Sequence, residues 1–136
     1  MKLYKNDILE ILKKYNFDSN EYIIISSAAL VLQGVKEYTT DIDVACSDTL
    51  YNILLEVYNC FLGKIDGQHK VWYIDNLINF SNHYYDNSEY IELLGYKVQT
   101  IESVLNLKKK LNREKDKDDI KIILDFYKNK DIVKRD

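Results

Sequence analysis

Four consecutive apolar residues, Tyr22–Ile25, constrain the fold of this chain more than any other feature. Three of them are β-branched isoleucines, and no polar residue alternates with them. A strand of this composition is apolar on both faces, so it belongs in the middle of a sheet that is covered on both sides. Helical patterns flank this run, and the combination predicts an α/β domain with a mixed sheet and a helical C-terminal end.

The spacing of apolar residues divides the rest of the chain into elements. Helices are predicted over residues 5–16, 27–34, 50–61, 101–111 and 118–129. Ser27 and Thr49 are the expected N-caps of the second and third helices, Gly63 is expected to end the third, and Thr100 precedes the fourth. Strands are predicted over 41–46, 69–75 and 77–80, with 90–99 as further extended or turn structure. We expect one domain over 1–136, with an α/β core over 1–100 and C-terminal helices over 101–136.

The composition is that of an ordinary globular protein, with 46% apolar and 30% charged residues. No apolar run is long enough to span a bilayer, and residues 1–15 have the pattern of an amphipathic helix rather than of a signal peptide, so no membrane partner is expected. Cys46 and Cys60 lack metal-ligand spacing, and we expect both to be buried, reduced and structural. Reduced thiols are typical of a cytoplasmic protein.

The net charge of −3 is unevenly distributed. Residues 1–100 contain 8 basic and 14 acidic side chains, whereas residues 101–136 contain 11 basic and 8 acidic ones. The basic residues concentrate in "LKKKLNREKDKDD", which would also suit a solvated helix face. Aromatic residues do not interleave with them in a sustained stripe, so charge gives no indication of nucleic-acid binding.

Asp41 and Asp43 are the main candidates for chemistry. They flank Ile42 at the start of a predicted strand, in which residues i and i+2 point to the same side. Both carboxylates would face one way while Ile42 and Val44 face the core. Two like charges this close destabilise each other unless a cation lies between them, and Mg²⁺ is the usual one.

Ser26 and Ser27 form a second candidate, where a predicted strand passes into a helix. Backbone N–H groups at a helix N-terminus attract anions, and small side chains let a phosphate approach. Beside the aspartate pair, such a turn would place Mg²⁺ between phosphate oxygens and carboxylates.

These residues lie in "IISSAALVLQGVKEYTTDIDVAC", residues 24–46, which resembles the signature of the nucleotidyltransferase superfamily. In that signature an apolar strand, a small-residue turn and a helix precede D-x-D on a second strand. The Thr-Asp-Ile-Asp ending is similar to the branch of AbiEii-type and lincosamide-type transferases. A second segment, "LKKKLNREKDKDDIKIIL", resembles the K-x4-R-x-K-D-x2-D helical segment of that branch.

The resemblance implies a minimal nucleotidyltransferase fold, with a mixed β-sheet flanked by helices and a C-terminal helical pair. It also implies transfer of a nucleoside monophosphate from an NTP to an acceptor, with Mg²⁺ or Mn²⁺ as cofactor. By motif match, Asp41 and Asp43 would be the catalytic metal ligands, and Ser26 and Ser27 the phosphate-binding turn. Lys108, Arg113 and Lys115 would contact phosphates, with Asp116 and Asp119 bracing the helical pair. The acceptor (a protein, a tRNA or a small molecule) is not indicated.

Two departures from the family pattern support a different function. Ser26 stands where the family usually has glycine, and Asn79 stands where a third carboxylate is expected, with Asp75 the only acid nearby. Asparagine cannot act as a base and binds metal more weakly than a carboxylate. The alternative is a catalytically degenerate binding module, such as the antitoxin or regulator of an operon-encoded partner. A third hypothesis is an antibiotic-modifying enzyme, but the chain is short for the additional acceptor-binding domain that such enzymes often contain.

Several other residues are assigned to packing rather than to function. His69 and His83 have no nucleophile or carboxylate at a telling distance in the sequence. The aromatic residues Trp72, Tyr73, Tyr84 and Tyr85 would be able to stack a nucleobase, but packing on the sheet is the expectation for all four.

Overall fold

The computed structural model describes residues 1–66 and 69–135, with the backbone alone for 66 and 131–135. Within this part, the chain forms five α-helices, two short 3₁₀ helices and seven strands. In order they are α1 (Lys5–Tyr15), η1 (Ser19–Glu21), β1 (Tyr22–Ile25), α2 (Ser26–Leu32), β2 (Ile42–Cys46), α3 (Asp48–Val57), β3 (Phe61–Asp66), β4 (His69–Ile74), β5 (Ile78–Ser81), β6 (Tyr90–Leu93), β7 (Tyr96–Gln99), α4 (Ile101–Leu111), η2 (Glu114–Asp116) and α5 (Lys117–Arg135).

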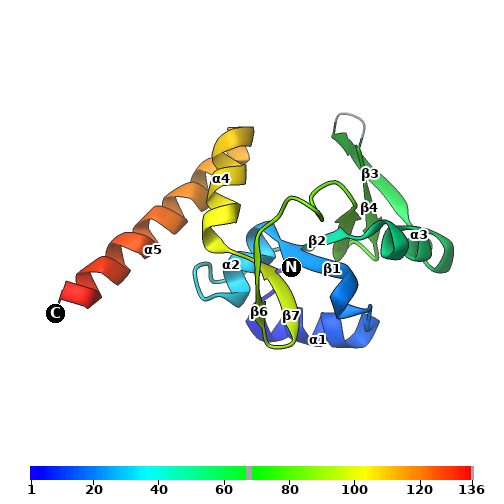
Figure 1. The fold of residues 1–136 in the computed structure, drawn as a ribbon, viewed down its shortest axis with the longest axis horizontal. Coiled ribbons are helices and arrows are strands. Elements are labelled where there is room, and N and C mark those ends of the chain that lie inside the picture. The colour runs from blue at the N-terminus through cyan, green and yellow to red at the C-terminus, as the bar shows by residue number, and fades with distance from the viewer. Residues whose placement is uncertain (67–68, 136) are drawn as a thin grey trace.

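The strands form one mixed sheet in the order β3-β4-β5-β2-β1-β7-β6 (Figure 1). β1 pairs with β2 antiparallel and with β7 parallel, and β2 pairs with β5 parallel. The remaining neighbours are antiparallel hairpins. The predicted α/β class and mixed sheet are therefore confirmed.

The central strand β1 is buried on both faces, as its apolar composition predicts. Tyr22 and Ile24 belong to the main hydrophobic cluster, which draws on residues from Leu3 to Ile123. Ile23 and Ile25 alternate with them and form a smaller cluster with Ala45, against which Tyr84 and Tyr85 pack. The second face of the sheet therefore has a much smaller apolar covering, and space remains there for a polar site.

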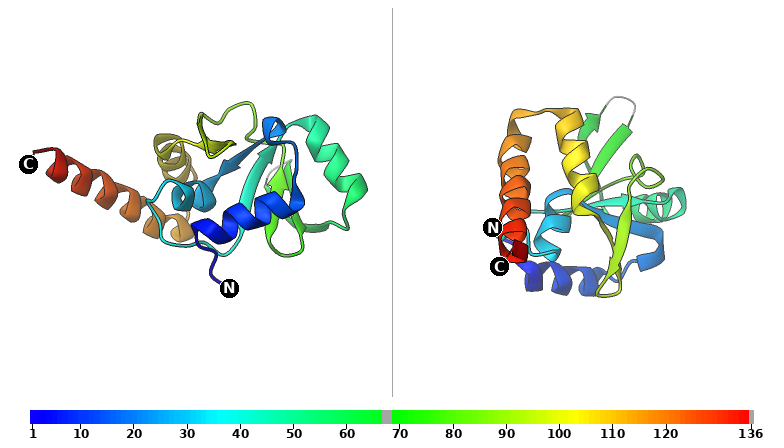
Figure 2. Two further views of the ribbon diagram at one scale, coloured as in Figure 1. Left: turned by 90° about the horizontal axis from the view of Figure 1, so that it is seen from below. Right: turned by 60° about the vertical axis from the view of Figure 1, so that its left-hand side comes forward.

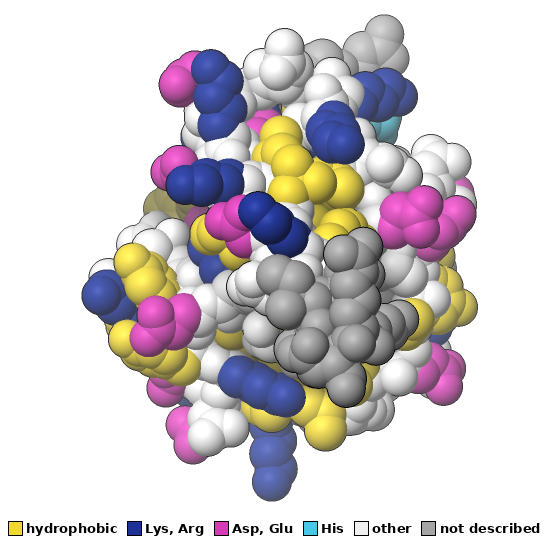
Figure 3. All heavy atoms as spheres, turned by 90° about the vertical axis from the view of Figure 1, so that its left-hand side faces the viewer, with side chains coloured by type: hydrophobic (Ala, Val, Ile, Leu, Met, Phe, Trp, Pro, Cys, Tyr) yellow, Lys and Arg dark blue, Asp and Glu magenta, His cyan; other side chains and the backbone are white. Residues whose placement is uncertain are grey.

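The C-terminal helices lie side by side. α4 and α5 run up and down next to each other and are joined through η2 (Figure 2, right). α5 then extends away from the sheet, on the side opposite α3 (Figures 1 and 2). Viewed from that side, basic and acidic side chains are interspersed around an apolar strip (Figure 3). Among the described residues, the lysine and arginine side chains on this face do not form a continuous patch (Figure 3).

The helix predicted over 50–61 is present, but its Thr49 cap and its end near Gly63 were wrong. The helix begins at Asp48, with the Ser47 Oγ accepting a hydrogen bond from the Leu50 N–H at 3.1 Å, and it ends at Val57. Phe61 starts strand β3, which pairs with β4, and Gly63 lies inside this strand instead of ending a helix. Helical apolar spacing continued past the true end of the helix, and only pairing with β4 defines the strand.

Smaller corrections concern a helix start and a cysteine. α2 begins at Ser26 with Ile25 as N-cap, so Ser27 is not the cap. Cys46 is buried, but Cys60 is only partly buried; both are free thiols.

Trp72 packs against the main cluster, as expected for the aromatic residues. No helix in the described part of the chain is both long and apolar enough to cross a membrane.

Candidate functional site

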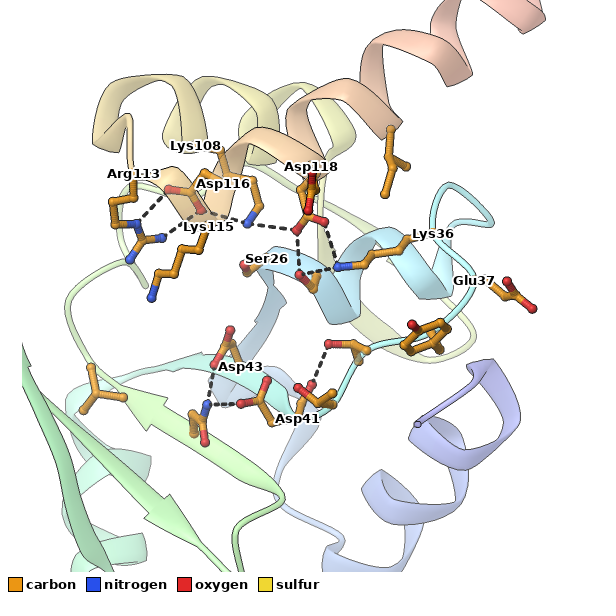
Figure 4. Close-up of a pocket in the computed structure, with 18 of the residues that line it drawn as sticks. Ser26, Lys36, Glu37, Asp41, Asp43, Lys108, Arg113, Lys115, Asp116 and Asp118 are labelled. Carbon is orange, nitrogen blue, oxygen red and sulfur yellow. Dashed lines mark hydrogen bonds and ion pairs between the residues drawn. The ribbon is translucent and has the colours of Figure 1, made fainter. Parts of the chain in front are cut away.

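The two aspartates lie together at the start of β2. Ile42 and Val44 are buried in the main core, and the side chains of Asp41 and Asp43 lie on the opposite side of the chain. The Asn79 Nδ2 donates a hydrogen bond of 2.9 Å to an oxygen of each carboxylate (Figure 4). Strand alternation therefore predicted the shared orientation, and the structure adds the amide group that bridges the pair.

Asn79 occupies the position beside Asp43 in the neighbouring strand. β5 runs parallel to β2, and Asn79 is the register partner of Asp43. Asn79 is 7% exposed, and its Oδ1 has no hydrogen-bond partner among the described residues. An unsatisfied buried amide oxygen costs about 1–3 kcal/mol.

Asp75, the other acid considered for the third position, lies in the tight turn between β4 and β5. It has a φ of 53°, and its carboxylate accepts a hydrogen bond from the Tyr15 hydroxyl on α1. Asp75 is not among the described residues that line the pocket of the aspartate pair. The position next to the pair thus holds an amide and not a third carboxylate.

The environment of Asp43 disfavours its charged form. Burial, followed by the negative charge of Asp41, raises the pKa of Asp43 from 3.8 to about 6. The hydrogen bond from Asn79 and the positive charges of Lys64 and Lys108 act in the opposite direction but do not cancel the effect. The carboxylate pair is therefore incompletely neutralised in the absence of a bound cation.

The opposite wall of the pocket is built by α4, η2 and α5 (Figure 4). Lys108 is 5% exposed, and its Nζ lies 3.3 Å from the Asp116 Oδ1 and 3.1 Å from the Asp119 Oδ2. Arg113 makes two hydrogen bonds to Asp116, of 2.7 and 3.1 Å. These ion pairs tie the helical segments together and hold Lys108 in place.

Both bracing carboxylates remain charged despite their burial. Burial alone would raise the pKa of Asp116, but the hydrogen bond from Arg113 and the charge of Lys108 hold it below its ordinary value. For Asp119, burial is likewise outweighed by hydrogen bonds from Lys36 and Ser27, and its pKa is lowered. Because Lys108 is shared between two carboxylates, its contribution to the pocket is mainly structural.

The two serines line the pocket, but the Ser26 backbone is less available than the sequence indicates. Its N–H donates to the Gln99 Oε1 at 2.9 Å and is therefore engaged within the protein. Ser26 also has a φ of 59°, a left-handed conformation that costs a residue with a Cβ about 1–2 kcal/mol. The Ser27 Oγ donates to the Asp119 Oδ2 at 2.7 Å, which connects the turn to α5.

A cluster of three cations faces the aspartates. Arg113 and Lys115 lie on the side of the pocket opposite Asp43, and their side chains extend toward it (Figure 4). Lys64, on β3, lines the same pocket. Burial, followed by the charges of Lys64 and Arg113, lowers the pKa of Lys115. Like charges gathered at one place favour an anion between them.

Sequence reasoning missed two lysines of this site. Lys64 was overlooked because β3 was read as the end of a helix, and no local signal marks it. Lys36 follows α2, and its Nζ lies 2.7 Å from the Asp119 Oδ1 and 3.3 Å from the Ser27 Oγ. Only the contacts of Asp119, on α5, with Ser27 and Lys36 bring this lysine into the site.

All the predicted site residues line one pocket of about 620 Å³: Ser26, Ser27, Asp41, Asp43, Lys108, Arg113 and Lys115. The same pocket is also lined by Lys36, Lys64, Tyr73 and Asn79. The described part of the chain holds no group of three or more His, Cys, Asp or Glu side chains placed for a metal ion. Two carboxylates and a buried amide with an unsatisfied oxygen nevertheless provide the oxygen ligands that Mg²⁺ prefers, and water or phosphate would supply the rest.

Comparison with protein-family models, with curated proteins and with solved structures finds no significant match to this chain. What the pocket does must therefore be inferred from its own side chains.

Proposed function

We propose that this pocket binds a nucleoside triphosphate with Mg²⁺ or Mn²⁺ and transfers the nucleoside monophosphate to an acceptor. The observation that carries the proposal is the separation of charge within one pocket. Asp41 and Asp43 form a wall that favours a cation, and Lys64 and Lys115, beside the ion pair of Arg113 with Asp116, form a wall that favours an anion. A metal-bound triphosphate satisfies both preferences at once.

The same proposal includes a nucleotidyltransferase-like fold. It is supported by the arrangement of β1, the turn into α2 and the adjacent β2 that begins with the aspartate pair. Ser27 and the start of α2 border the pocket beside this pair. A cytoplasmic location is part of the proposal and is supported by the two free thiols, Cys46 and Cys60.

In the proposed reaction, an acceptor oxygen attacks the α-phosphorus and the bond from this phosphorus to the bridging oxygen of the β-phosphate breaks. Pyrophosphate leaves with that electron pair, and the acceptor proton passes to water. A bound divalent cation would neutralise phosphate charge. Asp41 and Asp43 would hold it, while Lys64, Arg113 and Lys115 would position the phosphates and offset their charge.

One observation favours a catalytically degenerate binding module as the second candidate. Asn79 fills the third-acid position, and its amide already bridges the two carboxylates. A protein with this arrangement would bind a nucleotide, or an operon-encoded partner as an antitoxin or regulator, without turnover. Co-purification with the product of a neighbouring gene would favour this candidate.

Transfer of label from α-³²P NTPs, with Mg²⁺ and with protein, tRNA and small-molecule acceptors, tests the proposal. Calorimetry with a nonhydrolysable NTP, with and without Mg²⁺, measures binding separately. Asp41→Asn/Asp43→Asn and Lys115→Met should abolish or strongly reduce both signals. The exposed positions Asp86 and Lys109 provide matched controls, Asp86→Asn and Lys109→Met.

The two candidates predict different outcomes. Metal-dependent binding without transfer would favour the binding module, and Asn79→Asp should then confer measurable transfer by restoring the third carboxylate. Wild-type protein that shows neither metal-dependent nucleotide binding nor transfer would refute the proposed function.

A further inference from the structure

The side-chain amide of Asn79 has a hydrogen-bonded NH₂ group and an unsatisfied oxygen. Its Nδ2 donates at 2.9 Å to the Asp41 Oδ2 and at 2.9 Å to the Asp43 Oδ1. Its Oδ1 is buried and has no hydrogen-bond partner among the described residues. The NH₂ group of Asn79 therefore contacts two negatively charged carboxylates, while its amide oxygen accepts no hydrogen bond from the described residues.

Electrostatics explains this orientation in the absence of a cation. Asp41 and Asp43 take part in no ion pair within the described part of the chain, so the partly positive NH₂ group of Asn79 is the group that directly bridges them. The reversed amide would direct a partly negative oxygen at two carboxylates, and repulsion would oppose it.

A divalent cation between the carboxylates would reverse this preference. The NH₂ group would then face a positive ion, and the amide oxygen would be attracted to it. The two ends of a carboxamide are nearly equal in size, and rotation about the last side-chain bond of asparagine exchanges them without displacing the backbone. Asparagine carbonyl oxygens are ordinary ligands of hard divalent cations.

We propose that Asn79 reverses its amide when a divalent cation occupies the space between Asp41 and Asp43, so that Oδ1 replaces Nδ2 and becomes the third oxygen ligand. This inference rests on the proposed function, because it requires a cation at the aspartate pair. An amide ligand adds no negative charge, so the cation binds weakly alone and more tightly together with a triphosphate. Binding of the metal and binding of the nucleotide therefore strengthen each other.

Mn²⁺ titration of the wild-type protein and of Asn79→Leu, alone and with a nonhydrolysable NTP, tests the role of the amide. Leucine has nearly the same shape as asparagine but neither donates nor ligates. If Oδ1 is a ligand, Asn79→Leu weakens Mn²⁺ binding by about tenfold or more. If the amide only competes with metal for the carboxylates, the same variant binds Mn²⁺ equally or more tightly, and the inference is overturned.

Asn82 provides a matched control because its Nδ2 also donates to an aspartate, the Asp48 Oδ1 at 2.8 Å, outside the pocket. Asn82→Leu should leave Mn²⁺ affinity unchanged. Should Asn79→Leu fail to fold, NMR of the ¹⁵N-labelled wild type gives the answer, with the Asn79 side-chain signals assigned from their absence in Asn79→Asp. Saturation with Mg²⁺ and the NTP analogue should shift these signals as the carboxylate hydrogen bonds are lost.

The outcomes separate the two levels of the proposal. Wild-type protein that binds no Mn²⁺, with or without nucleotide, overturns both the proposed function and this inference. Wild-type binding together with unchanged Asn79 side-chain signals overturns the inference alone. Weaker binding by Asn79→Leu together with shifted signals supports it.

Discussion

Replacing Asp43 by asparagine should stabilise the metal-free protein. Burial and the charge of Asp41 raise the pKa of Asp43 from 3.8 to about 6. A tenfold change in proton affinity corresponds to about 1.4 kcal/mol, so the ionised group destabilises the folded state by about 3 kcal/mol above pH 6. Asparagine has no charge, and its amide oxygen still accepts the hydrogen bond that Asn79 donates.

The pH dependence follows from the sign of this shift. Below pH 3.8 the carboxyl group is protonated in both folded and unfolded states, so the wild type incurs no penalty. Between pH 3.8 and 6 the unfolded state loses its proton first, and wild-type stability falls as the pH rises. The gain from Asp43→Asn should therefore be about 3 kcal/mol at pH 7.5 and only about 1 kcal/mol at pH 4.5.

Urea denaturation with EDTA present, followed by the fluorescence of the single tryptophan, Trp72, measures these free energies of unfolding. Asp86→Asn, at an exposed turn, is the control and should change stability little at either pH. A variant less stable than wild type at pH 7.5, or a gain equal at both pH values, would refute the reasoning.

Three further substitutions test other parts of the site. Ser26→Gly should stabilise the protein by about 1 kcal/mol in thermal or urea denaturation because it relieves the left-handed strain, whereas Ser26→Ala keeps the Cβ and should give no gain. Lys108→Met should lower the free energy of unfolding by about 3 kcal/mol or more, because it leaves two buried carboxylates with one cation fewer. Lys109→Met, at an exposed position, should leave the free energy of unfolding nearly unchanged. Gly63→Ala should displace the Tyr73 ring, because a Cβ at position 63 would lie 2.2 Å from the Tyr73 Cε1. Nucleotide affinity, measured by calorimetry, should then fall. Unchanged affinity would show that this ring does not shape the binding pocket.

The sequence by itself determined the local features of this protein. Four apolar residues placed β1 in the middle of the sheet, and alternation along β2 put Asp41 and Asp43 on one side. The N-cap of α4 at Thr100 was also predictable. These features depend on residues a few positions apart, whose relative orientation is fixed by backbone geometry.

Contacts between distant segments were decided only by the tertiary structure. β3 and its Lys64 could not be recognised before β4 paired with it, and Lys36 enters the site only because Asp119, on α5, contacts it. The sequence marked Asn79 as an anomaly, but its position beside Asp43 depends on the parallel register of β2 and β5. Such pairings join residues that are tens of positions apart, and the hydrophobic core that all these elements share selects them.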